Sequence, residues 1–151
     1  MTDSKTKNEI YVSRDRRNLG HANAAKLIKK AAENALEYEG MDNCIISCML
    51  TDDDGIQQLN REFRGVDAVT DVLSFPMGDT DIESGKTVLG DMMINVKRCE
   101  EQGIEFGHGF DREIMYLTVH SVLHLLGYDH VDEGEMKKEM RSHEKAIMGD
   151  E

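Results

Sequence analysis

Three histidines near the C-terminal end of the sequence, His120, His124 and His130, have a spacing that could hold a metal ion. Residues four apart in an α-helix lie about 40° apart around its axis, one turn from each other. The imidazoles of His120 and His124 can therefore reach the same ion. Gly127 follows at a place where a helix can end with a positive φ, so the chain can turn back and bring His130 to that ion. Three protein nitrogens leave a fourth tetrahedral position open, which is typical of a catalytic zinc site.

Ordinary core histidines are the alternative, because the surrounding residues are apolar. A single histidine on an apolar helix is more often a hydrogen-bonded core residue than a ligand. Two buried imidazoles without partners would be destabilising, however, because their desolvation would not be compensated. The spacing of all three histidines therefore favours a metal site that binds one zinc ion per chain. The apolar neighbours are Val119, Val122, Leu123, Leu125 and Leu126.

The same spacing occurs in the metzincin protease pattern H-E-x-x-H-x-x-G-x-x-H, which this chain matches at all three histidines and at the glycine. The chain differs at the residue after the first histidine, where Ser121 replaces the glutamate that acts as general base. A serine hydroxyl does not accept a proton near neutral pH as a carboxylate does. The difference argues against peptide hydrolysis and favours another metal-assisted hydrolysis.

Length and charge limit the classes of function. The 151 residues suffice for one domain with a hydrophobic core. The formal net charge of −12 opposes a phosphate backbone, so a nucleic-acid substrate would need local basic residues and a metal ion. The start of the chain lacks a signal-peptide pattern, and no apolar run has the length of a membrane span. We therefore expect a cytoplasmic protein without membrane association, whose three cysteines are buried apolar residues in a reducing compartment.

Hydrophobic periodicity predicts a single α+β domain over residues 1–151, with the polar residues 1–8 frayed. Pro76, the only proline, should end a strand, and Gly90 suggests a bulge or a close backbone approach. A mixed sheet of about four strands should pack against helices, one of which is the central metal-binding helix. The expected strands are 9–13, 44–50, 70–76 and 87–95, and the expected helices are 22–39, 53–64, 96–103, 111–126 and 132–148. Their expected inward residues include Ile56, Leu59 and Phe63 in one helix and Met136, Met140 and Ile147 in another.

Four sequence blocks together resemble the YbeY family of endoribonucleases, also called rRNA maturation factors, which have a zincin-like fold. The blocks span residues 59–130 in the family's order. Where the family often has Arg-Gly-x-Asp-x-x-Thr-Asp, this chain has the matching residues from Arg64 to Asp71, and the family motif allows Ser121. The blocks are LNREFRG at 59–65, TDVLSFP at 70–76, LGDM at 89–92 and the histidine array at 120–130.

The resemblance implies a metal-dependent endoribonuclease that cuts single-stranded RNA. Family members act on the 3′ end of small-subunit rRNA and in ribosome quality control, so the implied partners are rRNA, the ribosome or its small subunit, and assembly factors. The resemblance implies that His120, His124 and His130 bind Zn²⁺, and that Arg64 and His120 are catalytic. A guanidinium at the mouth of a metal site can hold a phosphate with two donors. The spacing of Arg64 alone favours an exposed residue at a helix C-terminus, where the dipole stabilises a positive charge, and the resemblance of the surrounding motif reverses that preference.

Three carboxylates are further candidates for roles around the metal. Asp129 could orient a ligand imidazole, act as a base, or simply cap the turn. Asp71 and Asp91 could support the ligands, although solvated strand-edge residues are the alternative for both. Three other histidines lack ligand spacing and are expected at the surface, namely His21, His108 and His143.

Two other functions compete with the nuclease. One is a non-catalytic ribosome assembly factor with a structural zinc ion, which would require a fourth protein ligand such as Asp129. The other is a metalloprotease, which the serine in place of the glutamate disfavours.

Overall fold

The structure, a computed structural model, describes residues 7–128 and 134–149. The expectations for Asp129 and His130, and for residues 1–6, lie outside the described residues. Asn8, which the sequence predicted to be frayed, is held in place. Its side chain donates to the Met41 carbonyl at 3.2 Å and accepts from the Cys44 backbone N–H at 2.8 Å.

Four strands form one mixed sheet, as predicted. The spatial order is β1-β2-β4-β3, with β1, β2 and β4 parallel and β3 antiparallel to β4. The edge position of β3 matters for the site, because β3 contacts α4, the helix that carries His120 and His124. The strands are β1 (Glu9–Arg14), β2 (Cys44–Thr51), β3 (Val72–Thr80) and β4 (Thr87–Asn95).

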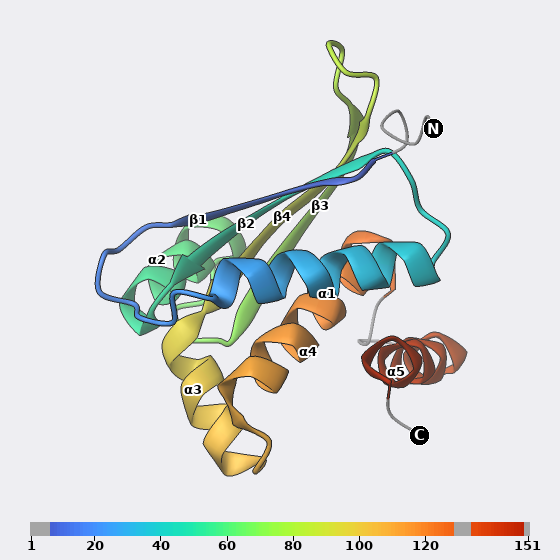
Figure 1. The fold of residues 1–151 in the computed structure, drawn as a ribbon. Helices are drawn as coiled ribbons and strands as arrows, with labels where there is room; N and C mark the ends of the chain where they lie inside the picture. Colours follow the sequence, from blue (N-terminus) through green and yellow to red (C-terminus); the bar gives the residue numbers. More distant parts are fainter. Residues whose placement is uncertain (1–6, 129–133, 150–151) are drawn as a thin grey trace.

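The described residues form five helices, and α1 and α4 pack against one face of the sheet (Figure 1). Helix α4 is predominantly apolar and is buried between α1, α3, α5 and the sheet, so it runs through the centre of the molecule. The described residues include no helix with the length and apolarity needed to cross a membrane. The helices are α1 (Ala24–Tyr38), α2 (Asp53–Arg64), α3 (Val96–Glu105), α4 (Gly109–Leu125) and α5 (Glu135–Met148).

The core lies between the inner face of the sheet and helices α1 and α4. Side chains of alternating residues on β2 and β4 point into it, as the period of two in a strand requires. All three cysteines are free and buried, which agrees with their prediction as small core residues. Burial raises the pKa of the Cys48 thiol to about 12. Fully buried core residues include Ile46, Leu50, Met92 and Ile94 of the sheet, Ile28 and Leu36 of α1, and Ile114, Val122 and Leu123 of α4.

Gly90 has both properties predicted from its position in a strand. The register between β2 and β4 shifts beside it, and its φ of +146° is unfavourable for residues with a side chain. A Cβ at this position would lie 2.2 Å from the Phe75 carbonyl oxygen. A glycine therefore allows β3 and β4 to approach each other beneath the metal-binding helix.

The prediction that Pro76 ends its strand is wrong, because β3 continues to Thr80. The residues from 77 to 80, predicted as loop, form part of a hairpin with β4 that projects beyond the rest of the sheet (Figure 1). Proline lacks the N–H that a central strand needs, but β3 is an edge strand with one unpaired side. The register shift between Pro76 and Asp79 accommodates the ring.

Two residues predicted to point inward are exposed. Phe63 of α2 is 67% exposed and Met136 of α5 is 41% exposed, whereas Ile56 and Met140 are buried as predicted. The C-terminal half of α2 extends past the sheet, where Phe63 makes an edge-to-face contact with Phe75 at 5.9 Å. Only part of each predicted apolar stripe is therefore in the core.

Candidate metal centre

Helix α4 brings His120 and His124 together on one face, as their spacing predicts. Their Nε2 atoms lie 3.2 Å apart. Two nitrogens bound to one tetrahedral ion at about 2.0–2.1 Å would be separated by about 3.3 Å. The two imidazoles are therefore already arranged as ligands of one zinc-sized ion.

A buried carboxylate fixes the orientation of the first histidine. Glu144 of α5 is 5% exposed, and its Oε2 lies 2.5 Å from Nδ1 of His120. With Nδ1–H donating to this carboxylate, Nε2 keeps the lone pair that a metal needs. The Tyr116 hydroxyl donates to the other oxygen of Glu144 at 3.1 Å, and burial together with this carboxylate raises the pKa of Tyr116.

The end of α4 has the geometry predicted for Gly127. Gly127 has a φ of +109°, and its N–H donates to the His124 carbonyl at 3.0 Å. The N–H of Tyr128 donates to the Leu123 carbonyl at 3.0 Å, which completes a Schellman motif. The helix therefore stops directly after its second histidine, and the chain turns toward residues 129–133.

A second polar cluster holds Tyr128, the residue that follows this turn. The Tyr128 hydroxyl donates to Glu39 at 3.1 Å and lies 3.0 Å from Nδ1 of His143, which is itself 2.6 Å from Glu39. Burial and the Glu39 carboxylate raise the pKa of Tyr128 to about 12, so its hydroxyl stays protonated as a donor. The cluster joins α1, α5 and the end of α4.

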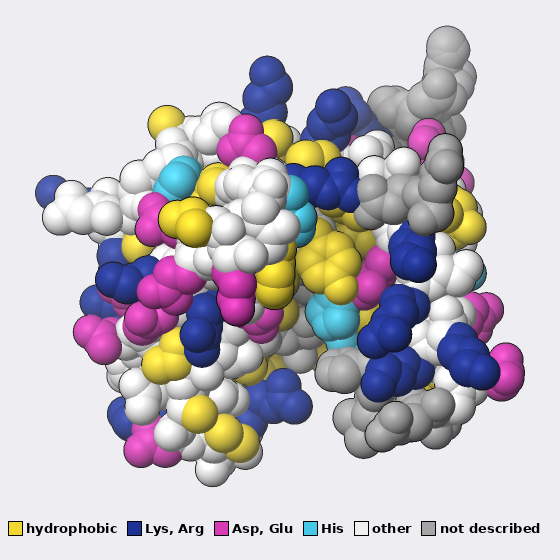
Figure 2. Space-filling view, turned by 90° about the horizontal axis from the view of Figure 1, so that it is seen from below, with side chains coloured by type: hydrophobic (Ala, Val, Ile, Leu, Met, Phe, Trp, Pro, Cys, Tyr) yellow, Lys and Arg dark blue, Asp and Glu magenta, His cyan; other side chains and the backbone are white. Residues whose placement is uncertain are grey.

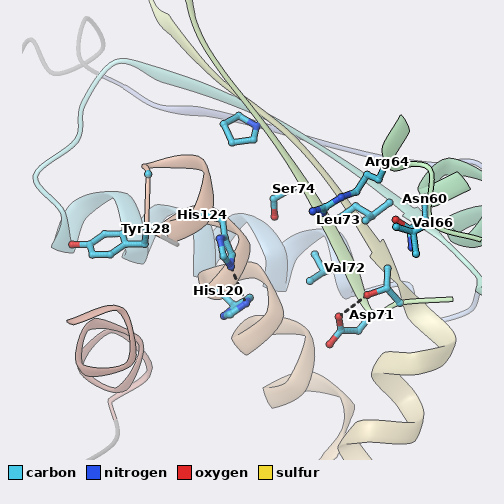
Figure 3. Close-up of a pocket in the computed structure, with 13 residues that line it drawn as sticks. Asn60, Arg64, Val66, Asp71, Val72, Leu73, Ser74, His120, His124 and Tyr128 are labelled. Atoms are coloured by element: carbon cyan, nitrogen blue, oxygen red, sulfur yellow. Dashed lines mark hydrogen bonds between the residues drawn. The ribbon is translucent and has the colours of Figure 1, made fainter. Parts of the chain in front are cut away.

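The two histidines face a pocket of about 720 Å³ between α4, β3 and the C-terminal end of α2. Arg64, the last residue of α2, extends from the opposite wall toward this space (Figure 3). It is exposed, and the helix behind it ends at Gly65. The remaining lining residues are Asn60, Val66, Thr70, Asp71, Val72, Leu73, Ser74, Pro76, Gly127 and Tyr128.

Ser121 points into the contact between α4 and the sheet. It is fully buried, and its Oγ lies 2.5 Å from Oγ of Ser74 on β3. The hydroxyl is therefore used in packing the helix against the sheet.

Asp71 and Asp91, the carboxylate candidates within the described residues, lie in different places. Asp71 lines the pocket and accepts from the Thr70 hydroxyl and the Gln102 amide, each at 3.4 Å. Asp91 precedes Met92, which pairs with Ser74 on the face toward α4, so Asp91 points to the opposite face of the sheet. We therefore leave Asp91 out of the proposed site.

The three histidines expected at the surface are each paired with a carboxylate and are only partly exposed. His21 lies 2.5 Å from Glu100, and His108 lies 2.6 Å from Glu113. His143 belongs to the Tyr128 cluster described above. Of these three, only His143 is connected to the metal-binding turn, and spacing alone could not reveal this.

The third predicted ligand, His130, lies outside the described residues. Within residues 7–128 and 134–149, no set of three His, Cys, Asp or Glu side chains is grouped to hold a metal ion. Glu144 was missed at the sequence level, although a signal was present. It lies four residues after Met140 on the buried stripe of α5, and a carboxylate in such a position usually has a partner.

Comparison with known proteins agrees with the geometry. Residues 9–150 match the family described as "Endoribonuclease YbeY". Relatives of that name from Clostridium kluyveri and Clostridioides difficile are 43% and 47% identical, covering 82% and 80% of this chain and 86% and 81% of their own. The solution structure of TM1509 from Thermotoga maritima is similar with a TM-score of 0.59 and 27% identity, covering 93% of this chain and 89% of that one. This chain belongs to the endoribonuclease YbeY family.

Proposed function

We propose that this chain is a single-domain endoribonuclease that cuts single-stranded RNA with one Zn²⁺ ion bound by His120, His124 and His130. The family to which it belongs is that of an endoribonuclease, and RNA is its substrate class. One observation carries the proposal for the site. Two histidine Nε2 atoms lie 3.2 Å apart and face an arginine across a pocket of about 720 Å³.

The residues around the histidines suit a mononuclear metal site. When bound, the ion would supply a Lewis acid for the scissile phosphodiester. Glu144 holds His120 in the tautomer whose Nε2 faces the pocket, so the imidazole need not reorganise to bind. His120 acts in catalysis through this fixed orientation. Asp129 is a further candidate for orienting a ligand.

Arg64 provides the phosphate-binding group of the proposed site. Its guanidinium can donate two hydrogen bonds to one phosphate and offset the charge that develops at phosphorus. Asp71 lines the same pocket and is held by Thr70 and Gln102, so it can limit where the anionic RNA backbone lies. A protease mechanism is disfavoured, because the position of the protease glutamate is taken by Ser121, which is buried against Ser74.

The proposed cellular role is maturation of the 3′ end of small-subunit rRNA and ribosome quality control in the cytoplasm. The proposed partners are the ribosome or its small subunit together with assembly factors. This role fits the family to which the chain belongs.

Cleavage assays on metal-loaded protein test this proposal. We expect about one zinc ion per chain by mass spectrometry of the metal, cleavage of an rRNA-like single strand, and no cleavage of an unstructured peptide. A chelator should abolish cleavage, and added Zn²⁺ should restore it. Stoichiometric zinc without any RNA cleavage would instead support the non-catalytic assembly factor. Peptide cleavage would support the protease.

A further inference from the structure

Helix α5 gathers four lysine and arginine side chains along one groove in an otherwise acidic chain, while its glutamates Glu135, Glu139 and Glu144 lie outside the residues that line that groove. Four of the 18 lysines and arginines of the chain lie in this helix of 14 residues. They line a shallow groove of about 460 Å³, together with one serine hydroxyl. We call this surface the α5 basic face, and it consists of Lys137, Lys138, Arg141, Ser142 and Lys145.

The basic residues form a continuous row along the helix. Lys137, Arg141 and Lys145 are spaced by four, so they follow one another on successive turns over about 12 Å. Lys138 lies beside them on the same side. Lys138, Arg141 and Lys145 are exposed, and the described residues contain no carboxylate in ion-pair contact with them. By contrast, Arg16, Arg61 and Lys86 each form an ion pair with a neighbouring carboxylate.

Helix α5 is linked to the proposed metal centre through the side chains of Glu144 and Tyr116. Glu144, between Arg141 and Lys145 in the sequence of the helix, bonds His120. The Tyr116 hydroxyl donates to Glu144, and the Tyr116 ring stacks on the His120 ring with the two centroids 6.0 Å apart. Figure 2 shows Lys and Arg side chains gathered along one side of a hollow that exposes hydrophobic and histidine side chains.

We propose that the α5 basic face binds the phosphates of the single-stranded RNA where the strand leaves the metal pocket. This inference rests on the proposed function and extends its substrate site beyond the pocket. With a net charge of −12, the chain repels a polyanion over most of its surface, so a local row of cations determines the path of the strand. Contacts to phosphates position a strand without reading its sequence. The groove therefore favours long substrates over short ones and has no base preference of its own.

A matched pair of triple variants tests this path. Lys138→Gln/Arg141→Gln/Lys145→Gln removes three charges from the α5 basic face. Arg17→Gln/Lys26→Gln/Lys29→Gln removes one arginine and two lysines from exposed positions before and on α1. Cleavage by the metal-loaded proteins is compared on a 20-nucleotide and a 4-nucleotide single-stranded RNA at several salt concentrations.

We expect the α5 variant to lower kcat/KM for the long RNA on the order of tenfold near 0.1 M salt, mainly through KM. Because each lost phosphate contact reduces the salt slope by about 0.7, the slope should fall by about 2. The short RNA should be cleaved at the wild-type rate, and the α1 variant should behave as wild type on both substrates.

Two results would overturn the inference in distinguishable ways. Equal effects in the two triple variants, or no effect in either, would refute RNA binding by the α5 basic face. The proposed nuclease function would not be affected by this result. The α5 basic face would then be a candidate surface for an acidic protein. Absence of RNA cleavage by the metal-loaded wild-type protein would overturn the proposed function, and this inference with it.

Discussion

The two walls of the metal pocket are built in different ways. The α4 wall presents His120 and His124, and buried hydrogen bonds to Glu144 and Ser74 tie this helix to α5 and the sheet. The α2 wall presents Arg64, an exposed residue at the end of a helix. The histidines of one wall are fixed by the interior of the protein, whereas the arginine of the other wall is exposed to solvent and lies beside the buried Asn60.

This difference separates metal binding from substrate binding. A metal ligand must be held in a narrow range of positions. A buried hydrogen bond to the ring nitrogen that does not face the metal provides this. A phosphate-binding arginine can move with its substrate and needs less support. Changes to the α4 wall should therefore affect metal content first, and changes to the α2 wall should affect catalysis alone. Four substitutions test this contrast, and they are ordered by expected size.

His124→Ala should have the largest effect, because it removes one of three proposed ligands from the rigid wall. We expect most of the zinc to be lost and RNA cleavage to fall on the order of 10³-fold, since the Lewis acid is lost with the metal. Metal analysis of the purified variant checks the first point. Stoichiometric, tightly bound zinc in this variant would refute the ligand assignment. Acidification should also release the metal from wild type, because only neutral imidazoles bind it.

Arg64→Ala should reduce RNA cleavage on the order of 100-fold or more while zinc content and the melting temperature stay at the wild-type level. The helix keeps its Gly65 terminus and its buried Ile56, so little packing is lost. Arg61→Ala is the matched control, because Arg61 lies in the same last turn but pairs with Asp67 outside the pocket. Loss of metal or of stability in Arg64→Ala would show that the two walls are not independent.

Glu144→Gln should weaken zinc affinity by about 10–100-fold, because an amide supports the His120 imidazole less well than a carboxylate does. At saturating zinc, much of the cleavage activity should return, which distinguishes a positioning residue from one that contacts RNA. Competition with a chelator of known affinity measures the effect. The control is Glu139→Gln on the exposed side of the same helix. Unchanged zinc affinity in Glu144→Gln would mean that the buried contact does not support the ligand.

Ser121→Ala should have the smallest effect, because the hydroxyl contacts Ser74 and not the ligands. We expect full zinc content, most of the ribonuclease activity, and a loss of about 1 kcal/mol in the free energy of unfolding. A double-mutant cycle with Ser74→Ala should assign that loss to the pair. Abolished cleavage with metal intact would show that the serine acts in the chemistry.

Local sequence patterns predicted most elements and the placement of His120 beside His124. The spacing of His120 and His124 was sufficient because both lie on one helix, where geometry is fixed by the turn. Glu144 is 24 residues from His120, and Tyr128 is 89 residues from Glu39, so these contacts depend on how the helices pack. The extent of β3 beyond Pro76 could not be predicted either, because it depends on the strand lying at the edge of the sheet.

The two helices that meet at the pocket both do so with their C-terminal ends, at Arg64 on α2 and at Gly127 after α4. Each helix dipole places roughly half a negative charge at that end. Together they offer about one negative charge of backbone origin, which attracts a divalent cation and repels a phosphate. Without the metal ion, Arg64 alone would have to offset this negative charge, so we expect RNA to bind more weakly and binding to proceed in the order metal first and substrate second.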